Sequence, residues 1–437
     1  MIFSLEVIRA RKGDCLMLHY GTPEDLRLMM IDGGPRGVYA PHLKPRIEQI
    51  RTGLQTPPDK PLDVEILMVS HVDDDHIQGI LDLTSDLKTA IEQHKPQLVK
   101  VFYFWHNSFE NVIGKTPPEL ITALTTKFGP ASIGGDPPEM TLDLDDEDEE
   151  TIVSSLKVLA SIKQGQQLRS DIINRLGAML NFEFDGNLIL AQKNTEPLDV
   201  GNGLNLTVVG PMLEELRNLQ AEHQKWLEDL KKEGKTAEDV LVAYVDKSVP
   251  NLSSVVVLAE AGGKRILLTG DARGDKILEG LELVGLVEDG GTLEVDILKV
   301  PHHGSSNNLD DDFFERIIAR HYVFSGNGEH GNPERESLEM LLRARREEDY
   351  TVHLTYPIDE IDVARQAEWE KQQASEKKRR ENAIKQGKPG KKVREDWSPA
   401  EHSLAALCDA NPDFANKVRI MKEGEPHVIN LLDDFDF

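Results

Sequence analysis

Five side chains that can bind a metal ion fall within six residues of this sequence, directly after an apolar run. They are His71, Asp73, Asp74, Asp75 and His76. The run Val64–Val69 before them reads as a buried strand, and residues just past the end of a strand can converge on one point. Converging imidazoles and carboxylates bind divalent ions, whereas unpaired carboxylates in a cleft repel one another. The motif therefore predicts a metal site at a strand end, with an acidic loop holding two incidental histidines as the alternative.

Two later segments repeat this arrangement of an apolar strand followed by polar groups. Ile266–Leu268 leads into Thr269-Gly270-Asp271, and Asp296–Val300 leads into Pro301-His302-His303-Gly304-Ser305. Neighbouring side chains of an extended chain face opposite ways. We therefore expect one of the two histidines to be a ligand and the other to shape the cleft. A pair of buried, hydrogen-bonded histidines is the alternative for this segment alone.

Composition limits the class of protein. The 437 residues carry a net charge of −27, which argues against a protein that coats nucleic acid but leaves a nuclease open, because bound divalent ions reverse the local field. Two cysteines cannot form a disulfide framework or a cysteine-rich zinc site. The chain shows neither a signal peptide nor an apolar run near the ~20 residues that span a bilayer. We expect a cytoplasmic enzyme that has no membrane contact.

Strand and helix patterns divide the chain into a core, an insertion and an extension. Strands are expected at 2–7, 15–20, 26–31, 64–69, 98–105, 188–190, 204–209, 253–260, 264–269, 295–300 and 427–432, with a helix at 77–87. Residues 1–345 are predicted to form one domain, with an insertion at about 110–185 that holds the acidic run 143–150. Residues 346–437 are predicted to form a C-terminal extension with a basic helical arm at 364–393 and a terminal strand.

The ordered motifs resemble the metallo-β-lactamase superfamily. They are Asp32-Gly33-Gly34, His71-x-Asp73-x-Asp75-His76, Gly270-Asp271 and Pro301-His302-His303-Gly304-Ser305. The aspartate at position 73, where the wider superfamily has histidine, makes the chain most similar to the hydrolase domain of ComEC-type DNA-uptake proteins and their soluble relatives. The resemblance implies an α/β fold, the four-layer αββα sandwich, here with an insertion and a C-terminal extension.

The resemblance also implies two metal positions that share one carboxylate. Its ligands are His71 and Asp73 for one ion, Asp75, His76 and His303 for the other, and Asp271 as the bridge. Where the superfamily has a further histidine, this chain has Asn251, which either ligates through its amide oxygen or leaves the first position weak or empty. Asp73 and Asn251 make that position rich in oxygen, which favours Mn²⁺ or Mg²⁺ relative to Zn²⁺.

The function implied is hydrolysis by a metal-bound hydroxide, with phosphodiesterase or nuclease action on DNA or RNA favoured. Asp75, His302 and His330 are assigned to catalysis, and Ser305 and Asn332 to substrate binding. A hydrolase of a small ester, lactone or nucleotide is the alternative, and a non-catalytic subunit of a larger complex is the second. A protein partner is possible through the acidic run and the C-terminal arm, and the oligomeric state stays open.

Overall fold

Two mixed sheets form the centre of the protein. The computed structural model describes residues 1–107, 164–217 without 166 and 215, and 253–435 without 347, 386 and 388. In spatial order the first sheet is β15 (His427–Asn430), β1 (Ile2–Val7), β2 (Leu16–Thr22), β3 (Asp25–Ile31), β4 (Leu62–Val69), β5 (Val99–His106) and β6 (Met179–Leu180). The second is β14 (Val418–Ile420), β13 (Thr351–Leu354), β12 (Ile317–Phe324), β11 (Leu293–Lys299), β10 (Lys264–Leu268), β9 (Val256–Ala261), β8 (Asn205–Gly210) and β7 (Leu198–Asp199).

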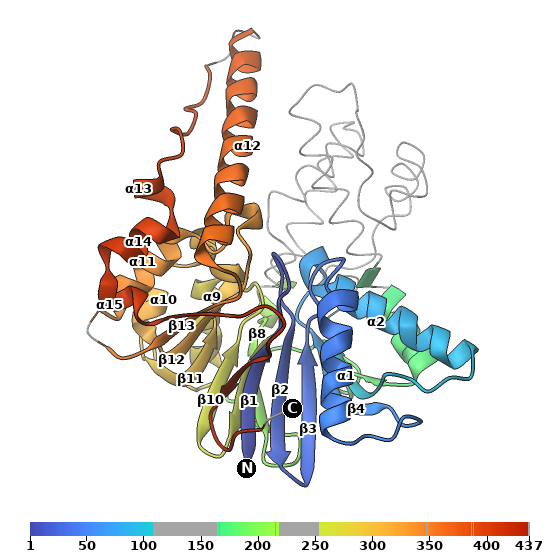
Figure 1. Ribbon diagram of the computed structural model, residues 1–437. Coiled ribbons are helices and arrows are strands. Elements are labelled where there is room, and N and C mark those ends of the chain that lie inside the picture. The colour runs from blue at the N-terminus through green and yellow to red at the C-terminus, as the bar shows by residue number, and fades with distance from the viewer. Residues whose placement is uncertain are drawn as a thin grey trace.

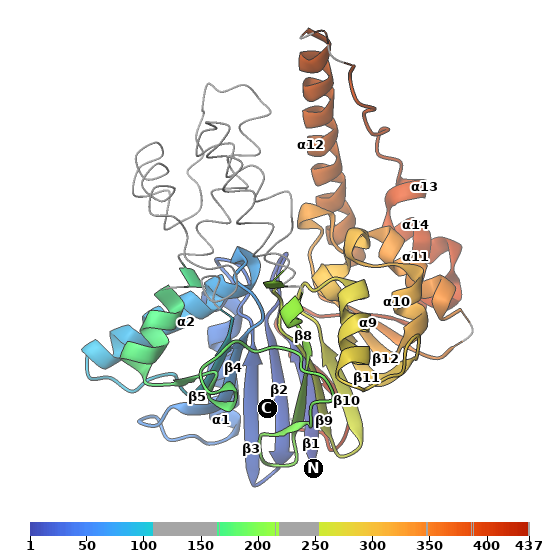
Figure 2. The ribbon, with the colours of Figure 1, turned by 180° about the vertical axis from the view of Figure 1, so that it is seen from behind.

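Helices cover the outer face of each sheet, as Figures 1 and 2 show. The first sheet carries α1 (Lys44–Gly53) and α2 (Asp74–Glu92), and the second carries α9 (Gly274–Leu283), α10 (Asp311–Arg316) and α11 (Arg335–Ala344). The C-terminal region adds α12 (Ile358–Lys385), α13 (Pro399–His402), α14 (Leu404–Ala410) and α15 (Pro412–Ala415). The expected four-layer αββα sandwich is confirmed.

Apolar side chains fill the three spaces between these four layers. On β3 and β4, Met30 and Leu67 pack outward with the helices of the first sheet. Their neighbours Met29 and Ile66 point the other way, into a core shared with Ile297 of the second sheet. Because strand side chains alternate between faces, a nearly continuous apolar strand serves both spaces at once. The two sheets therefore hold their strand ends in fixed relative positions.

Each strand expected from the sequence is present except the one at 188–190. Residues 188–190 are not a strand, because the backbone N–H and C=O of Ile189 bond to the side-chain amide of Asn107 and not to a neighbouring strand. The sequence did not predict β6, β7, β12, β13 or β14, and α2 is longer at both ends than the helix expected at 77–87. The acidic run 143–150 and Asn251 lie outside the described residues.

Residues of the C-terminal region complete both sheets. The terminal strand lies at a sheet edge as expected, since β15 pairs antiparallel with β1 and places Asn430 opposite Ser4. β13 and β14 extend the second sheet. β6 lies within the range expected to be an insertion and pairs with β5. In the described part of the chain, no helix combines the length and the apolar character needed to cross a bilayer.

Candidate metal centre

The three polar clusters singled out in the sequence meet where strand ends of the two sheets face each other. β4 of the first sheet leads into His71, while β10 and β11 of the second sheet lead into Asp271 and His302–His303. Backbone hydrogen bonds from Val255 to Ser70 and from His302 to Gly270 join the loops. Asp271 is buried at the centre of the cluster.

One carboxylate oxygen of Asp271 faces two histidines, and we call this set the inner group. Asp271 Oδ1 lies 3.2 Å from His76 Nε2 and 3.4 Å from His303 Nε2, and the two nitrogens are 3.3 Å apart. Donor atoms about 2.0–2.1 Å from a shared ion at tetrahedral angles lie about 3.3–3.4 Å from one another. The three atoms are thus spaced as ligands of one ion, with Asp75 Oδ2 at 3.8 Å from His303 Nε2.

The other oxygen of Asp271 faces a second, wider set, the outer group. Asp271 Oδ2 lies 3.7 Å from His71 Nε2 and 3.7 Å from His302 Nε2. Asp73 Oδ2 lies 3.7 Å from His71 Nε2. Asp271 therefore stands between two sets of donor atoms, which is the arrangement that the resemblance implied for it.

The placement of His302 differs from the sequence reading. An extended chain would turn the rings of His302 and His303 to opposite sides, but these residues form a tight turn with φ of 47° and 54°. In this left-handed conformation both rings approach Asp271, one at each carboxylate oxygen. His302 consequently joins the outer group, which then has two imidazoles and two carboxylates and is less rich in oxygen than the sequence suggested.

Two glycines fix the start of α2 beneath the cluster. Gly33 N–H donates to the carbonyl of His76, and Gly79 N–H donates to the carbonyl of Gly34. A Cβ on Gly33 would lie 2.5 Å from the backbone nitrogen of Ile80. This contact therefore requires glycine, and it holds the first turn of the helix, with His76, against the end of β3.

The histidines of the inner group are oriented by groups behind them. His76 Nδ1 lies 2.8 Å from Asp32 Oδ2, and Asp32 also accepts hydrogen bonds from the backbone and hydroxyl of Ser70. His303 Nδ1 lies 2.9 Å from Ser325 Oγ and 3.4 Å from Asp14 Oδ1. Partners at Nδ1 leave the Nε2 lone pairs directed toward Asp271, as in histidines that bind metal ions.

Asp14 and Lys299 form a buried ion pair beside the inner group. Lys299 Nζ lies 2.7 Å from Asp14 Oδ2, and both side chains are 1% exposed. Sequence reasoning gave neither residue a role, although Lys299 is a charged residue within an apolar strand and such a residue needs a partner. Asp32 was noted as part of a motif without a role, and Ser325 was given none.

The charges of the cluster shift the pKa values of its members. Burial alone would raise the pKa of Asp271, but the neighbouring histidines, His303 first, lower it well below its usual value. Burial lowers the pKa of His303, yet Asp271 and Asp14 raise it to about 9. At His76, burial likewise lowers the pKa, but Asp271 and Asp32 raise it well above 6.5. Without an ion, protons on these histidines balance the buried carboxylates, and a divalent cation would replace them.

Two buried atoms of the cluster fit a bound ion. Within the described residues, His71 Nε2 and Asp271 Oδ1 are inaccessible to solvent, and when the neighbouring histidines carry no proton at Nε2 neither atom has a hydrogen-bond partner. Asp14, His76, Asp271 and His303 each offer a donor atom within 4.8 Å of the others, and all four are buried. Since leaving buried polar atoms unpaired costs about 1–3 kcal/mol each, a cation among them would relieve that cost.

Three other residues assigned from the sequence lie around the cluster. His330 is exposed on the turn η7 (Glu329–Gly331), where its Nε2 lies 3.0 Å from Lys12 Nζ. The hydroxyl of Ser305 donates to Glu334. The amide of buried Asn332 donates to the backbone carbonyl of His302, so it supports the turn that carries the histidines.

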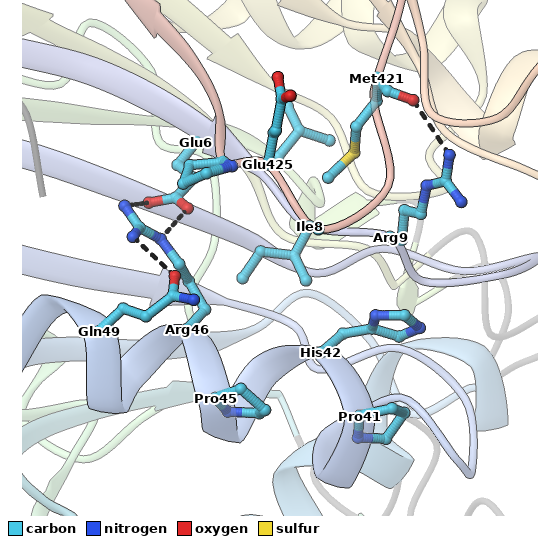
Figure 3. A pocket seen from close by; sticks show the side chains of 13 residues that line it. Glu6, Ile8, Arg9, Pro41, His42, Pro45, Arg46, Gln49, Met421 and Glu425 are labelled. Carbon is cyan, nitrogen blue, oxygen red and sulfur yellow. Dashed lines mark hydrogen bonds and ion pairs between the residues drawn. The ribbon is translucent and has the colours of Figure 1, made fainter.

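A pocket of about 110 Å³ lies apart from this cluster, between β1, α1 and residues 421–426 (Figure 3). Glu6 accepts hydrogen bonds from Arg46 there, and Arg9 donates to the backbone carbonyl of Met421. Burial would raise the pKa of Glu6, but His19 and Arg46 hold it below its usual value. The pocket therefore adds no reactive group to the candidate centre.

Comparisons with known proteins give partial matches, and no family model matches the chain. The chain is 35% identical over 85 residues to microtubule-associated protein 1A of Rattus norvegicus, which covers 19% of this chain and 3% of that protein. It is 40% identical over 70 residues to microtubule-associated protein futsch of Drosophila melanogaster, covering 15% and 1%. It is 28% identical over 100 residues to ComE operon protein 3 of Bacillus subtilis, covering 22% and 12%. The chain thus spans a small part of the length of each relative.

A solved structure, zinc-bound PqqB from Methylobacterium extorquens, aligns with 78% of this chain and 84% of its own, at 12% identity and a TM-score of 0.32. The fold assignment rests on the strand order, the covering helices and the three apolar layers described above.

Proposed function

We propose that the chain is a metal-dependent hydrolase of phosphodiesters, with DNA or RNA as the favoured substrate and with a relationship to ComEC-type hydrolases. The observation that supports it most is the inner group, whose three donor atoms lie 3.2–3.4 Å apart. His76, His303 and one oxygen of Asp271, with Asp75 nearby, would hold one divalent ion. His71, Asp73, His302 and the other oxygen of Asp271 would hold a second, and Zn²⁺ and Mn²⁺ are the candidate ions.

The bound ions would supply a water of lowered pKa and neutralise charge on the attacked group. Substrate approaches from the side where Asp73, Asp75 and His302 are 29%, 22% and 27% exposed, because the remaining donors are buried. Burial would raise the pKa of Asp75, but His76 and His303 keep it below its usual value, so the carboxylate is an acceptor that can orient the attacking water.

A nearby cation favours an anionic substrate over a neutral ester or lactone. The charge of Lys12 is near enough to Asp75 to contribute to the lowering of the pKa of that carboxyl group. Lys12 contacts His330, and together the two can meet a phosphate oxygen. A small-molecule hydrolase remains the second candidate, since nothing in the cluster itself requires a polymer.

The test is hydrolysis of bis-p-nitrophenyl phosphate and of labelled DNA and RNA, single- and double-stranded, with Mn²⁺, Zn²⁺ or Mg²⁺. His76→Asn is the inactive variant, because it removes one donor of the inner group. His94→Asn is the matched control, since His94 is exposed and has a φ of 53° that asparagine tolerates.

Metal-dependent cleavage that is lost in His76→Asn and kept in His94→Asn would support the proposal. Cleavage of the small diester alone would favour the second candidate. A protein that purifies without metal, binds none when it is added and cleaves nothing would overturn the enzymatic proposal in favour of a non-catalytic subunit.

A further inference from the structure

The C-terminal arm concentrates positive charge on an otherwise acidic protein. We define the arm as α12 with the returning segment to residue 398, and it projects away from the sandwich in Figures 1 and 2. Its far part, residues 377–394, which we call the basic tip, contains nine lysines and arginines and one glutamate. The tip thus carries +8, and because the whole chain carries −27, the rest of the chain carries −35.

The arm is held in shape by contacts between its two limbs. Trp369 of α12 stacks on His402, with ring centroids 4.3 Å apart, and its indole N–H donates to the carbonyl of Glu395. Further out, Arg394 of the returning segment pairs with Glu376, with 2.7 Å between nitrogen and oxygen, and lies over the ring of Trp369. The basic tip therefore extends from a braced base.

The base of the arm is joined to a loop at the edge of the candidate metal centre. Arg365 of α12 donates to the carbonyl of Gly331 in η7. A Cβ on Gly328, just before η7, would lie 2.3 Å from the carbonyl oxygen of Ile361, so helix and loop are in direct contact. Asn332, just after η7, supports the His302 backbone. The arm consequently rises from the rim of the cluster.

We infer that the basic tip is a docking surface for the phosphate backbone of nucleic acid, an inference that rests on the proposed function. Backbone contacts need only positive charge, whereas a protein interface needs buried apolar anchors. Lys377–Arg380 are all exposed, and Ile384 is the large hydrophobic side chain exposed in the described part of the tip. Because the rest of the chain carries −35, this surface is a concentration of positive charge that can attract a polyanion at a distance from the centre.

The position of the tip sets the length of substrate that can use it. Lys377 to Arg380 follow Arg365 by 12 to 15 helical residues, which is about 18–23 Å along the axis. At about 3.4 Å per nucleotide in a stacked strand, about six nucleotides cover this length, so a strand that reaches from the tip to the centre has at least that many. Hydrolysis of substrates of four nucleotides or fewer should therefore be independent of the charges of the tip, and hydrolysis of longer strands should depend on them.

The test compares two full-length variants that each lose four positive charges. The tip variant replaces Lys377, Lys378, Arg379 and Arg380 by Gln. The control variant replaces four exposed bases on the body by Gln: Lys95, Lys193, Arg320 and Lys422. Deletion of residues 365–396 is a poorer test, because it also removes the Arg365 contact with η7.

Binding is measured by anisotropy of fluorescein-labelled 4- and 24-nucleotide DNA and RNA, with a chelator present to prevent cleavage. For the 24-mers, loss of four phosphate contacts should weaken binding at least tenfold at 50 mM salt and lower the slope of log K against log salt by about 3. With metal present, hydrolysis of the 4-mers and of bis-p-nitrophenyl phosphate should be unchanged. Equal 24-mer binding by the tip and control variants would overturn the inference.

The outcomes also separate this inference from the proposed function. Diester hydrolysis without any effect of the tip on 24-mer binding would refute the docking surface alone. Tip-dependent binding in a protein that hydrolyses no diester would keep the surface and reject the function. Poly-glutamate binding as tight as that of the 24-mer, with the same dependence on the tip, would overturn nucleic acid as the occupant in favour of an acidic protein.

Discussion

The buried ion pair of Asp14 and Lys299 predicts that substitutions at the two positions have strongly non-additive effects on the free energy of unfolding. Lys299→Met removes the ammonium group 2.7 Å from Asp14 and leaves a buried carboxylate without its closest cation. Asp14→Asn leaves the buried ammonium unpaired in the same way. Removing one partner of a buried pair costs about 3–5 kcal/mol in the free energy of unfolding. The double variant leaves no unpaired charge, so we expect it within about 2 kcal/mol of the native protein.

The assay is urea unfolding of the four proteins with a chelator present, because a bound ion would add its own stabilisation to the folded state. Lys276→Met and Glu279→Gln are a matched control, since that exposed pair should contribute about 0–1 kcal/mol. Single costs at Asp14 and Lys299 that add up in the double variant, to within about 0.5 kcal/mol, would refute the reasoning.

Three further predictions concern the centre and the sheets. In the Asp73→Asn variant, elemental analysis should find one ion per chain, and in Asp271→Asn it should find none, because of the two carboxylates only Asp271 belongs to both groups. Equal metal content in the two variants would contradict this assignment. Gly33→Ala should cost about 3 kcal/mol by thermal unfolding, because its Cβ meets the backbone of α2, and an unchanged Tm would contradict the close packing. Burial, with His427, His321 and Arg419 near, lowers the pKa of His353 from 6.5 to about 3, so the unfolded chain takes up a proton below pH 6.5 that the folded chain does not. Stability should therefore fall by about 2 kcal/mol between pH 7 and pH 5 from His353 alone, and His353→Gln should reduce that slope in urea titrations at several pH values.

Much of the fold could be predicted because it depends on local pattern. The apolar runs that end in ligand-like residues gave the strands beside the centre, and the order of motifs gave the sandwich. β13 was not predicted from the sequence because it has four residues, too few for a periodic pattern to be recognised. Residues 188–190 were misread because Ile189 is buried like a strand residue while a side chain, that of Asn107, satisfies its backbone.

The candidate centre was predictable in its members but less so in its geometry. Spacing alone could not show that His302 and His303 lie in a left-handed turn, because that conformation depends on contacts made by the folded chain. Asp14 precedes Lys299 by hundreds of residues and meets it only when the two sheets pack. Pairs between residues so far apart produce no periodic pattern in the sequence, and the local sign of such a pair is a single charged residue within an apolar strand.

The pairing of β15 with β1 has a consequence for how the protein is made. Ser4 lies opposite Asn430, so β1 gains one of its neighbours only after the chain has been extended from Ser4 to Asn430. At about 5–20 residues per second, the ribosome needs about 20–85 s to add the intervening residues. During that time one edge of β1 has unpaired backbone groups that can pair with other chains. Nascent chains of this protein should therefore be at greatest risk of aggregation just before residue 430 emerges, and they should engage chaperones until it does.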